Sequence, residues 1–402
     1  MLFGLLFGSG ILSLPSWSWD TIQTYVHCAN YSGEWNDDAL AVLAAQPFVV
    51  FEKYHKVFEE PVVDAAEAKI AESCRRVKAL NPNTQCYMYT ESDWARTEYS
   101  LGHWFVDNPG AALSCSPGTN DSLCDCAAKG CAAAGCKQYN LHYPAYDFSN
   151  ATAREKWVER ITNATATGHV DGAFIDGNRG GWSSSILGGC PAEKKAAWAA
   201  GLGLAVKTLA QRLGPDKTLI SNYPTEAALA YCAGGMMERG GSSQAVQDFG
   251  KRPSCGLYNQ PCLLDYHAQY FARPADGKMA GFLLGVQKYG YFGGGSGWGG
   301  VGKGACKLWL TTFPEFSKKL GEPVSDMALG TAAWPGAVCD KSGAKRANTT
   351  GCLFTRAFAS GTKVFAGQFL APQGRNTGHC IYWSDGSVTT DNATRCMPKS
   401  AF

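Results

Sequence analysis

The sequence predicts an α/β protein built around a (β/α)8 barrel of the TIM type, with a Cys-rich insertion and a small C-terminal antiparallel β segment. Three observations lead to this fold class. Short apolar runs alternate with helical stretches, which is the pattern of parallel βα units. The length of 402 residues suits a barrel with insertions. Beyond Leu353, strands of period two and tight turns replace the alternation.

Residues 1–18 form an apolar run without side-chain charge, too short to span a bilayer as a helix. They predict a signal peptide, and the small residues Ser16 and Ser18 favour cleavage before Trp19. No later stretch reaches the apolar length of a membrane helix. We therefore expect a secreted or extracellular protein, at the cell surface or in a vacuolar lumen as further options, without a membrane partner.

The barrel is predicted over residues 19–335. Its strands are expected at Pro47–Glu52, Cys86–Thr90, Gln138–Tyr143, Val170–Asp176, Thr218–Asn222, Gly234–Glu238 and Met279–Val286, with Met327–Trp334 as an uncertain eighth. Helices are expected at Asp37–Ala45, Val63–Leu80, Ala151–Thr162, Pro191–Leu213 and Cys306–Leu320.

The cysteines indicate disulfides. All 17 follow the predicted signal peptide, and export makes disulfides the expected state, while their odd number leaves at least one thiol without a partner in the chain. Five of them lie in the insertion at about 112–137, which predicts a disulfide-knotted loop there. Their spacings do not match those of zinc sites, and we expect no metal.

The C-terminal segment, 336–402, is predicted to be a disulfide-linked β sheet, because Asp385-Gly386 between apolar strands is a strong hairpin signal. Six Asn-x-Ser/Thr sequons predict a glycoprotein with exposed acceptor loops. They are Asn30, Asn120, Asn150, Asn163, Asn348 and Asn392.

The composition limits the classes of molecule that the protein is expected to bind. A net charge of +2 with 17% charged residues argues against nucleic acid or a membrane surface. An aromatic content of 12% fits a carbohydrate partner, because flat rings stack on sugar faces. The glycine-rich run Gly297–Gly304 lacks the Ser or Thr of a phosphate loop, so we expect no cofactor and interpret Trp298 as part of a mobile loop over the barrel mouth.

Acidic residues directly after strands are the strongest catalytic candidates, because a barrel presents its reacting groups at the C-terminal ends of its strands. Asp176 and Glu238 meet this condition. The alternatives are a turn-capping role for Asp176 beside Gly177 and an ion pair between Glu238 and Arg239. Glu52 also ends a strand, and we expect it to bind substrate unless it forms an ion pair within the barrel mouth.

Other polar and aromatic residues near strand ends are candidates for substrate binding. They are Tyr89, Tyr143, Asn178, Arg179, Asn222, Lys288 and Trp298. Two carboxylates near one another are what glycosidic cleavage requires, one protonating the departing oxygen and the other stabilising or attacking the anomeric carbon.

The residues from Tyr146-Asp147-Phe148 to Asp171–Asn178, with Met236-Met237-Glu238-Arg239, resemble the hypothetical glycoside-hydrolase-like barrels. These are similar to the endo-α-1,4-polygalactosaminidase group and, more distantly, to α-galactosidase-type barrels. The resemblance covers Phe48 to Val286 in outline. It implies that the acids after the fourth and sixth strands, Asp176 and Glu238, are the catalytic pair.

We therefore expect a secreted glycoside hydrolase that cleaves O-glycosidic bonds of a polysaccharide or glycoconjugate. One alternative is a carbohydrate-binding or cell-surface protein on a barrel that has lost the reaction. Another is a polysaccharide lyase, which would need a Tyr, His or Lys base. A Ser-His-Asp hydrolase is disfavoured because the sequence contains no GxSxG motif.

Overall fold

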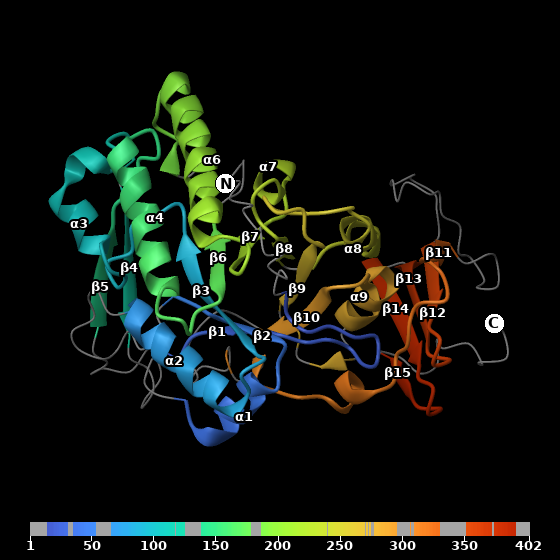
Figure 1. The fold of residues 1–402 in the computed structure, drawn as a ribbon. Helices are drawn as coiled ribbons and strands as arrows, with labels where there is room; N and C mark the ends of the chain where they lie inside the picture. The colour runs from blue at the N-terminus through green and yellow to red at the C-terminus, as the bar shows by residue number, and fades with distance from the viewer. Residues whose placement is uncertain are drawn as a thin grey trace, which may run out of the picture. The chain divides into compact units, whose positions relative to one another are not determined.

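The computed structural model (Figure 1) describes most of the chain. The described residues are 14–30, 35–53, 66–116, 118–124, 138–177, 186–238, 240–269, 271, 273–274, 277–295, 306, 309–329, 351–371 and 374–390. The chain divides into two compact units. The first unit comprises 1–16, 29–235 and 254–261, and the second comprises 17–28, 236–253 and 262–402.

Eight strands make up the principal sheet, in the order β1-β2-β3-β6-β7-β8-β9-β10. This order follows the chain once the separate hairpin β4–β5 is set aside. The pairs β2–β3, β3–β6, β6–β7 and β9–β10 are parallel. Sequential parallel strands with intervening helices are the plan of a (β/α)8 barrel. The predicted fold class, including its C-terminal antiparallel sheet, is confirmed.

Four of these strands belong to the first unit: β2 (Phe48–Phe51), β3 (Gln85–Glu91), β6 (Gly172–Asp176) and β7 (Thr218–Asn222). Almost every residue in them is buried, as expected for strands covered on both faces. Gly172 pairs with Tyr87 on one side and with Thr218 on the other. A Cβ at Gly172 would lie 1.8 Å from the Thr218 carbonyl oxygen, so this close approach requires glycine.

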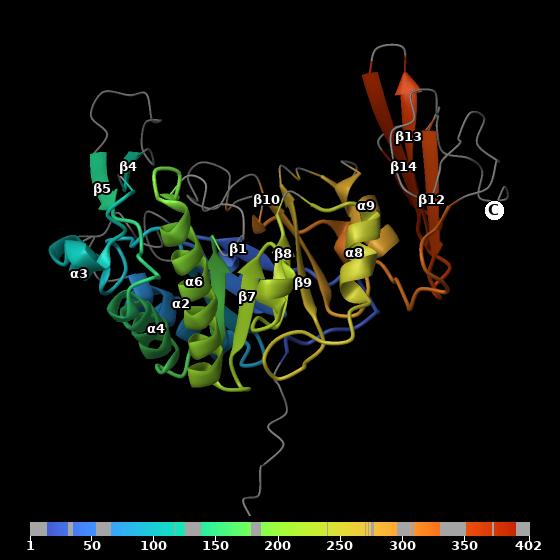
Figure 2. The same cartoon turned by 90° about the horizontal axis from the view of Figure 1, so that it is seen from above.

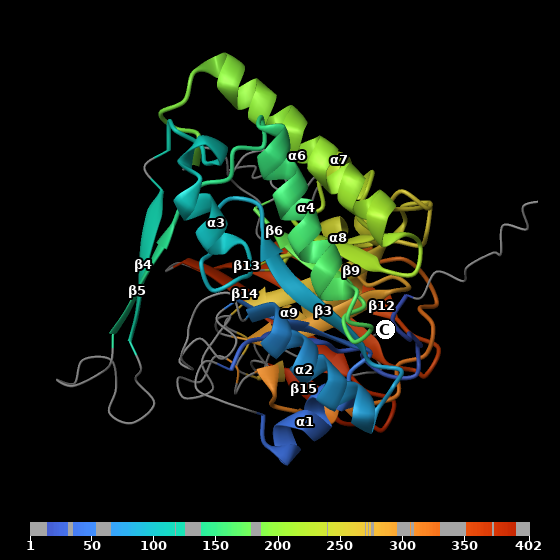
Figure 3. The same cartoon turned by 60° about the vertical axis from the view of Figure 1, so that its left-hand side comes forward.

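Helices of the first unit follow or precede these strands. They are α1 (Asp37–Ala44), α2 (Ala66–Leu80), α3 (Gly102–Asp107), η1 (Pro109–Ala111), α4 (Ala151–Thr165), α6 (Ala192–Leu213) and α7 (Glu226–Leu229). Asn150 caps α4 by accepting from the amides of Thr152 and Ala153. α4 and α6 run side by side (Figures 1 and 3). Gly201 of α6 permits the close approach of the segment that precedes α4, because a Cβ there would lie 1.8 Å from the Phe148 carbonyl oxygen.

The insertion after β3 contains a two-stranded hairpin, β4 (Thr119–Cys124) and β5 (Gln138–Tyr143), which extends away from α3 and α4 in Figure 3. Cys115 forms a disulfide with Cys190 and thus bonds outside the insertion rather than within a knotted loop. The remaining part of the insertion, 125–137, lies outside the described residues.

The second unit holds β1 (Val26–Cys28), β9 (Leu263–Gln269) and β10 (Gly290–Gly295), and the division between the units passes through β8 (Gly234–Met237). A parallel bridge joins Thr24 to Phe292 of β10. The second unit also contains the helices α8 (Ser243–Gly250), α9 (Lys278–Gly285) and η4 (Pro314–Ser317). A disulfide between Cys28 and Cys306 closes this part of the chain.

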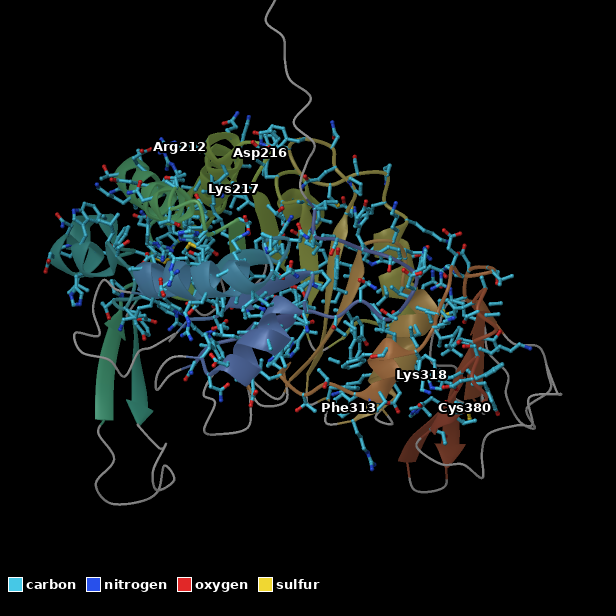
Figure 4. The ribbon with its side chains drawn as sticks, turned by 60° about the horizontal axis from the view of Figure 1, so that its bottom comes forward. Arg212, Asp216, Lys217, Phe313, Lys318 and Cys380 are labelled. Carbon is cyan, nitrogen blue, oxygen red and sulfur yellow. A yellow bond between two sulfur atoms is a disulfide. The ribbon has the colours of Figure 1, made fainter. Side chains whose placement is uncertain are left out.

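A five-stranded antiparallel sheet forms the C-terminal part of the second unit. Its strands are β11 (Ala328–Leu329), β12 (Gly351–Ala357), β13 (Lys363–Ala371), β14 (Gly374–Tyr382) and β15 (Val388–Thr390), and β12 to β14 lie side by side in Figure 2. The Asp385-Gly386 turn joins β14 to β15, and Lys318, labelled in Figure 4, forms an ion pair with Asp385 at 2.5 Å. Arg356 of β12 donates to the carbonyls of Leu283 and Val286 at the end of α9.

Several predicted elements need correction. Met279–Val286 is not a strand but corresponds to α9. Of the uncertain eighth strand at Met327–Trp334, the described residues end at Leu329 and contain β11, which belongs to the C-terminal sheet. The predicted strand Gln138–Tyr143 is β5 of the hairpin, outside the principal sheet. β1, β9 and β10 were not predicted from the sequence. Within the predicted helix Cys306–Leu320, the described residues Cys306 and Trp309 are helical and Pro314–Ser317 forms the short 3-10 helix η4, so the prediction is correct only in part.

Three cysteines of the described chain are free and buried, namely Cys74, Cys86 and Cys232. Of the predicted glycosylation sites, Asn163 is exposed, whereas Asn30 is 6% exposed. The side chain of Asn150 is engaged as the cap of α4 and donates to the Gly110 carbonyl at 3.1 Å. Within the described residues, every helix is too short or too polar to cross a bilayer.

Candidate functional site

Four polar side chains gather where the strands of the first unit end. Glu91, Asp176 and Asn222 are the last residues of β3, β6 and β7, and Glu52 directly follows β2. Side chains two apart along a strand share a face. The ring of Tyr89 stacks on Phe174 with centroids 6.0 Å apart. The site residues therefore continue this buried aromatic face of the strands at their C-terminal ends.

Asp176 accepts hydrogen bonds at both of its carboxylate oxygens. Its Oδ2 accepts a hydrogen bond from the Tyr89 hydroxyl at 2.7 Å. Its Oδ1 accepts from the Asn222 side-chain amide at 2.7 Å and from the Gly177 backbone amide at 2.8 Å. Three donors from three separate segments thus fix the carboxylate in one orientation, while Asp176 remains only half-buried.

These surroundings keep Asp176 ionised. Burial alone would raise its pKa, but the positive charge of Lys53 and the hydrogen bonds from Asn222, Tyr89 and Gly177 outweigh burial, so that the pKa is lowered from its ordinary value. Hydrogen bonds donated to a carboxylate favour the charged form. Asp176 is therefore a carboxylate throughout the neutral pH range.

The backbone around Asp176 is equally constrained. Ser92, which follows β3, donates both its amide and its hydroxyl to the Asp176 carbonyl at 2.9 Å. Gly177 has φ +77°, and a Cβ there would lie 2.7 Å from Oδ1 of Asp93. The residue after Asp176 must therefore be glycine for the two segments to pack this closely.

Glu52 and Lys53 form a pair beside Asp176. Lys53 Nζ lies 3.0 and 3.1 Å from the two carboxylate oxygens of Glu52, with side chains 15% and 1% exposed. The same ammonium donates to the Tyr89 hydroxyl at 3.3 Å and lies 4.3 Å from the centre of that ring. Lys53 thus connects Glu52 to the residue that holds Asp176.

The pKa of Glu52 moves in the opposite direction. Burial raises it, the charge of Lys53 lowers it and the charge of Asp176 raises it again, with a net pKa of about 7. Neighbouring carboxyl groups whose pKa values are driven apart are a typical feature of acid–base sites. Here the ionised member is Asp176, and Glu52 holds a proton into the neutral range.

A buried charge network supports the segment that follows β3. Arg96 forms ion pairs with Glu91 and Glu98, and its guanidinium lies 4.7 Å from the centre of the Tyr143 ring. Between α4 and α2, the Arg160 guanidinium lies 3.8 Å from a carboxylate oxygen of Glu67. Burial raises the pKa of the carboxyl groups of Glu67, Glu91 and Glu98, and the two arginines oppose that effect.

The second unit carries its own acidic group of residues. Glu238 directly follows β8 and is partly exposed. Burial and the charges of Asp265 and Glu238 raise the pKa of the Tyr25 hydroxyl well above its usual value. Asp265 of β9 is fully buried, and burial raises its pKa well above the ordinary value, an effect that the nearby Tyr25 hydroxyl opposes only in part.

Trp309 packs over the inner face of the second unit's strands. Its ring stacks on His267 with centroids 5.1 Å apart and contacts Tyr25 edge-on at 5.3 Å. Gly293 and Gly295 of β10 make room for it, because a Cβ at either position would lie within 2.5 Å of Trp309. The glycine-rich end of β10 is thus explained by packing.

The structure brings together Asp176, Glu52, Tyr89 and Asn222 of the predicted residues. Tyr143 is 1% exposed and packs on Arg96 instead of facing an open site. Lys288 lies before β10, at the N-terminal end of that strand, which is the opposite end from the one where substrate binding was expected. Asn178, Arg179 and Trp298 lie outside the described residues.

Two site residues were not selected from the sequence. Lys53 was visible only as the neighbour of Glu52, because nothing in the local pattern shows that it reaches Tyr89. Asp265 was missed together with β9. Within the described residues, no group of three or more His, Cys, Asp or Glu side chains is arranged to hold a metal ion.

Comparison with known families agrees with the resemblance noted in the sequence. Residues 78–251 match the model of hypothetical glycosyl hydrolase family 15, a range that includes Asp176 and Glu238. No curated protein matches the sequence significantly.

Solved structures give matches at low identity. The galactosidase domain of an α-galactosidase–sucrose kinase has 11% identity and a TM-score of 0.50, over 92% of this chain and 51% of that one. The α-galactosidase AgaA of Geobacillus stearothermophilus has 11% identity and a TM-score of 0.44, over 90% and 49%. A maltogenic α-amylase of Thermotoga neapolitana has 12% identity and a TM-score of 0.44, over 92% and 93%. The chain spans about half the length of the α-galactosidases, and the similarity is one of fold.

Proposed function

We propose that the protein is a glycoside hydrolase that cleaves O-glycosidic bonds of a polysaccharide or glycoconjugate outside the cell. The observation that carries this proposal is the state of Asp176. It is a half-buried, ionised carboxylate at the C-terminal end of the fourth strand of a barrel, held by three hydrogen bonds. The match of residues 78–251 to a hypothetical glycosyl hydrolase family points in the same direction.

In this proposal Asp176 acts on the anomeric carbon. Glycosidic cleavage develops positive charge on the sugar ring, and a fixed carboxylate either stabilises that charge, attacks the carbon or activates the attacking water. Tyr89 and Asn222 hold the carboxylate in a fixed orientation, so that little reorganisation is needed during the reaction.

The leaving oxygen needs a proton donor, and we assign that role to Glu238. It is partly exposed and directly follows the sixth strand. Glu52 is poorly suited to the role although its pKa is about 7, because both of its carboxylate oxygens contact Lys53. Asp265, fully buried in the second unit, is the other acid to be tested.

A lyase reaction is less well supported. Its base would have to remove a proton from carbon, and the tyrosine nearest to Asp176 is Tyr89. Burial and the negative charges of Asp176, Glu91 and Glu52 raise the pKa of Tyr89 well above its usual value. A tyrosine that already donates its proton to Asp176 is a poor base.

Leaving-group dependence tests the proposal. A panel of soluble polysaccharides and aryl glycosides is assayed for reducing-sugar and phenol release by the wild type, Glu238→Gln and Asp265→Asn. We expect Glu238→Gln to lose hydrolysis of natural linkages but to retain that of aryl glycosides with acidic phenols, which need no proton to depart. The same pattern in Asp265→Asn would move the donor role to Asp265. Saturable glycan binding without any product release would replace the enzymatic proposal with a binding function.

A further inference from the structure

Glu52 is linked to Asp176 by a chain of three contacts within the first unit. Lys53 contacts both carboxylate oxygens of Glu52 and donates to the Tyr89 hydroxyl. The Tyr89 hydroxyl in turn donates its own proton to Oδ2 of Asp176. Each link has one donor and one acceptor, so the direction of every hydrogen bond in the chain is fixed.

We propose that Glu52, Lys53 and Tyr89 form a positioning relay that fixes the orientation and the ionised state of Asp176. The inference rests on the proposed function and deepens it, since it names the residues that set the reactive form of the catalytic carboxylate. Glu52 anchors Lys53, and Lys53 acts on Asp176 through its charge and through Tyr89.

Burial makes these contacts effective. Glu52 and Tyr89 are each 1% exposed, and Lys53 is 15% exposed, so the charges interact with little screening by water. An isolated buried carboxylate would be unfavourable. Its pairing with Lys53 explains why Glu52 is tolerated directly after an apolar strand.

The groups that face Glu52 account for its ionisation. They are Lys53 on its own segment, Asp176 at the end of β6, and Arg96 after β3. The charge of Glu52 in turn raises the pKa of Tyr89 and Tyr99. The Lys53 charge lowers the pKa of Asp176 against the effect of burial and is the strongest of the contributions that do so. Removal of that charge should therefore raise the pKa of Asp176.

The test is a direct titration of Asp176 in the full-length protein. Aspartate carboxyl carbons are labelled with ¹³C, and the Asp176 signal is identified by its loss in Asp176→Asn. We expect Lys53→Met to raise the pKa of Asp176 by about 1 or more, as for loss of a close opposite charge, and Tyr89→Phe to raise it by less. Lys53→Gln, which keeps a polar side chain without the charge, gives the same rise and provides a second variant should Lys53→Met fold poorly.

Lys318→Met is the matched control. Lys318 is also an ion-paired lysine over an aromatic ring, with Nζ 2.5 Å from Asp385 and 5.8 Å from the centre of the Trp383 ring, but it lies in the second unit. The pKa of Asp176 should be unchanged in this variant. If Asp176 titrates in both Lys53 variants as it does in the wild type, the relay is overturned.

A double-mutant cycle tests the order of the relay. Because Glu52 acts mainly through Lys53, Glu52→Gln should change the pKa of Asp176 and kcat/KM much less in the Lys53→Met background than in the wild type. Additive effects of the two substitutions would contradict the relay. A response of the Asp176 pKa in a protein that hydrolyses no glycan would support the relay while the proposed function fails. Glycan hydrolysis by the wild type together with an unchanged Asp176 pKa in the Lys53 variants would support the proposed function and overturn the relay.

Discussion

Tyr89 donates a 2.7 Å hydrogen bond to Asp176 although 87 positions separate the two residues in the sequence. The contact follows from the register of adjacent parallel strands, in which Tyr89 pairs with Phe174, two residues before Asp176. Two residues along a strand return to the same face. The strand register therefore places Tyr89 beside the Asp176 carboxylate, and the segments after the strands add the contacts of Lys53 and Gly177.

The titration of Glu52 predicts a pH dependence of stability. Its pKa is raised from 4.5 to about 7 in the folded protein, so the stabilisation is fully present below pH 4.5 and is lost as the pH rises through 7. At about 1.4 kcal/mol per pKa unit, the loss amounts to at most about 3.5 kcal/mol. Relative to Glu52→Gln, the free energy of unfolding of the wild type should decline over this pH range in urea titrations. A constant difference between the two proteins would contradict the assignment.

Gly177→Ala should lower both stability and activity, whereas the same substitution in an ordinary turn should lower stability alone. Alanine at φ +77° costs about 1–2 kcal/mol, and its Cβ would also meet Asp93 at 2.7 Å. The control is Gly168→Ala, where φ is +79° and nothing lies within 4 Å of the added Cβ. We expect both variants to lose stability in thermal melts, with a further loss of kcat in Gly177→Ala alone. Equal effects would show that the contact with Asp93 is unimportant.

The buried network behind the site predicts a large difference between two arginines. Arg160 is 3% exposed, and Arg160→Met would leave Glu67 buried without its cation, at a cost of about 3–5 kcal/mol. Arg212, labelled in Figure 4, makes two 2.7 Å hydrogen bonds with Glu155, but both side chains are about half exposed. Arg212→Met should cost at most about 1 kcal/mol. Similar unfolding free energies for the two variants would argue against the role of the network.

Much of the fold could be predicted because strands buried on both faces give continuous apolar runs, as at Phe48–Phe51 and Gly172–Asp176. β9 was missed because Asp265 and His267 interrupt its apolar character, although both are fully buried. α9 is short and almost wholly apolar, and such a run cannot be distinguished from a strand by periodicity. The sequence-based strand order lacked β1 but counted β5 as a barrel strand. These two errors cancel, so that Asp176 ends the fourth strand in both the predicted and the observed order.

The candidate site was predictable only in part. An acid directly after an apolar strand identifies Asp176 and Glu52, and the strand ends identify Tyr89 and Asn222. The connection through Lys53 depends on the three-dimensional reach of one side chain across to β3. No local pattern contains that information.

The most direct test of the central claim is the rate of glycoside hydrolysis by Asp176→Asn, compared with the wild type on the same substrate. The amide keeps the shape of the side chain but has no negative charge to present to the anomeric carbon. We expect the rate to fall by at least about a hundredfold, the lower end of what such a group contributes, with an unchanged circular dichroism spectrum. A folded Asp176→Asn protein with wild-type activity would contradict the assignment of Asp176 as the catalytic carboxylate.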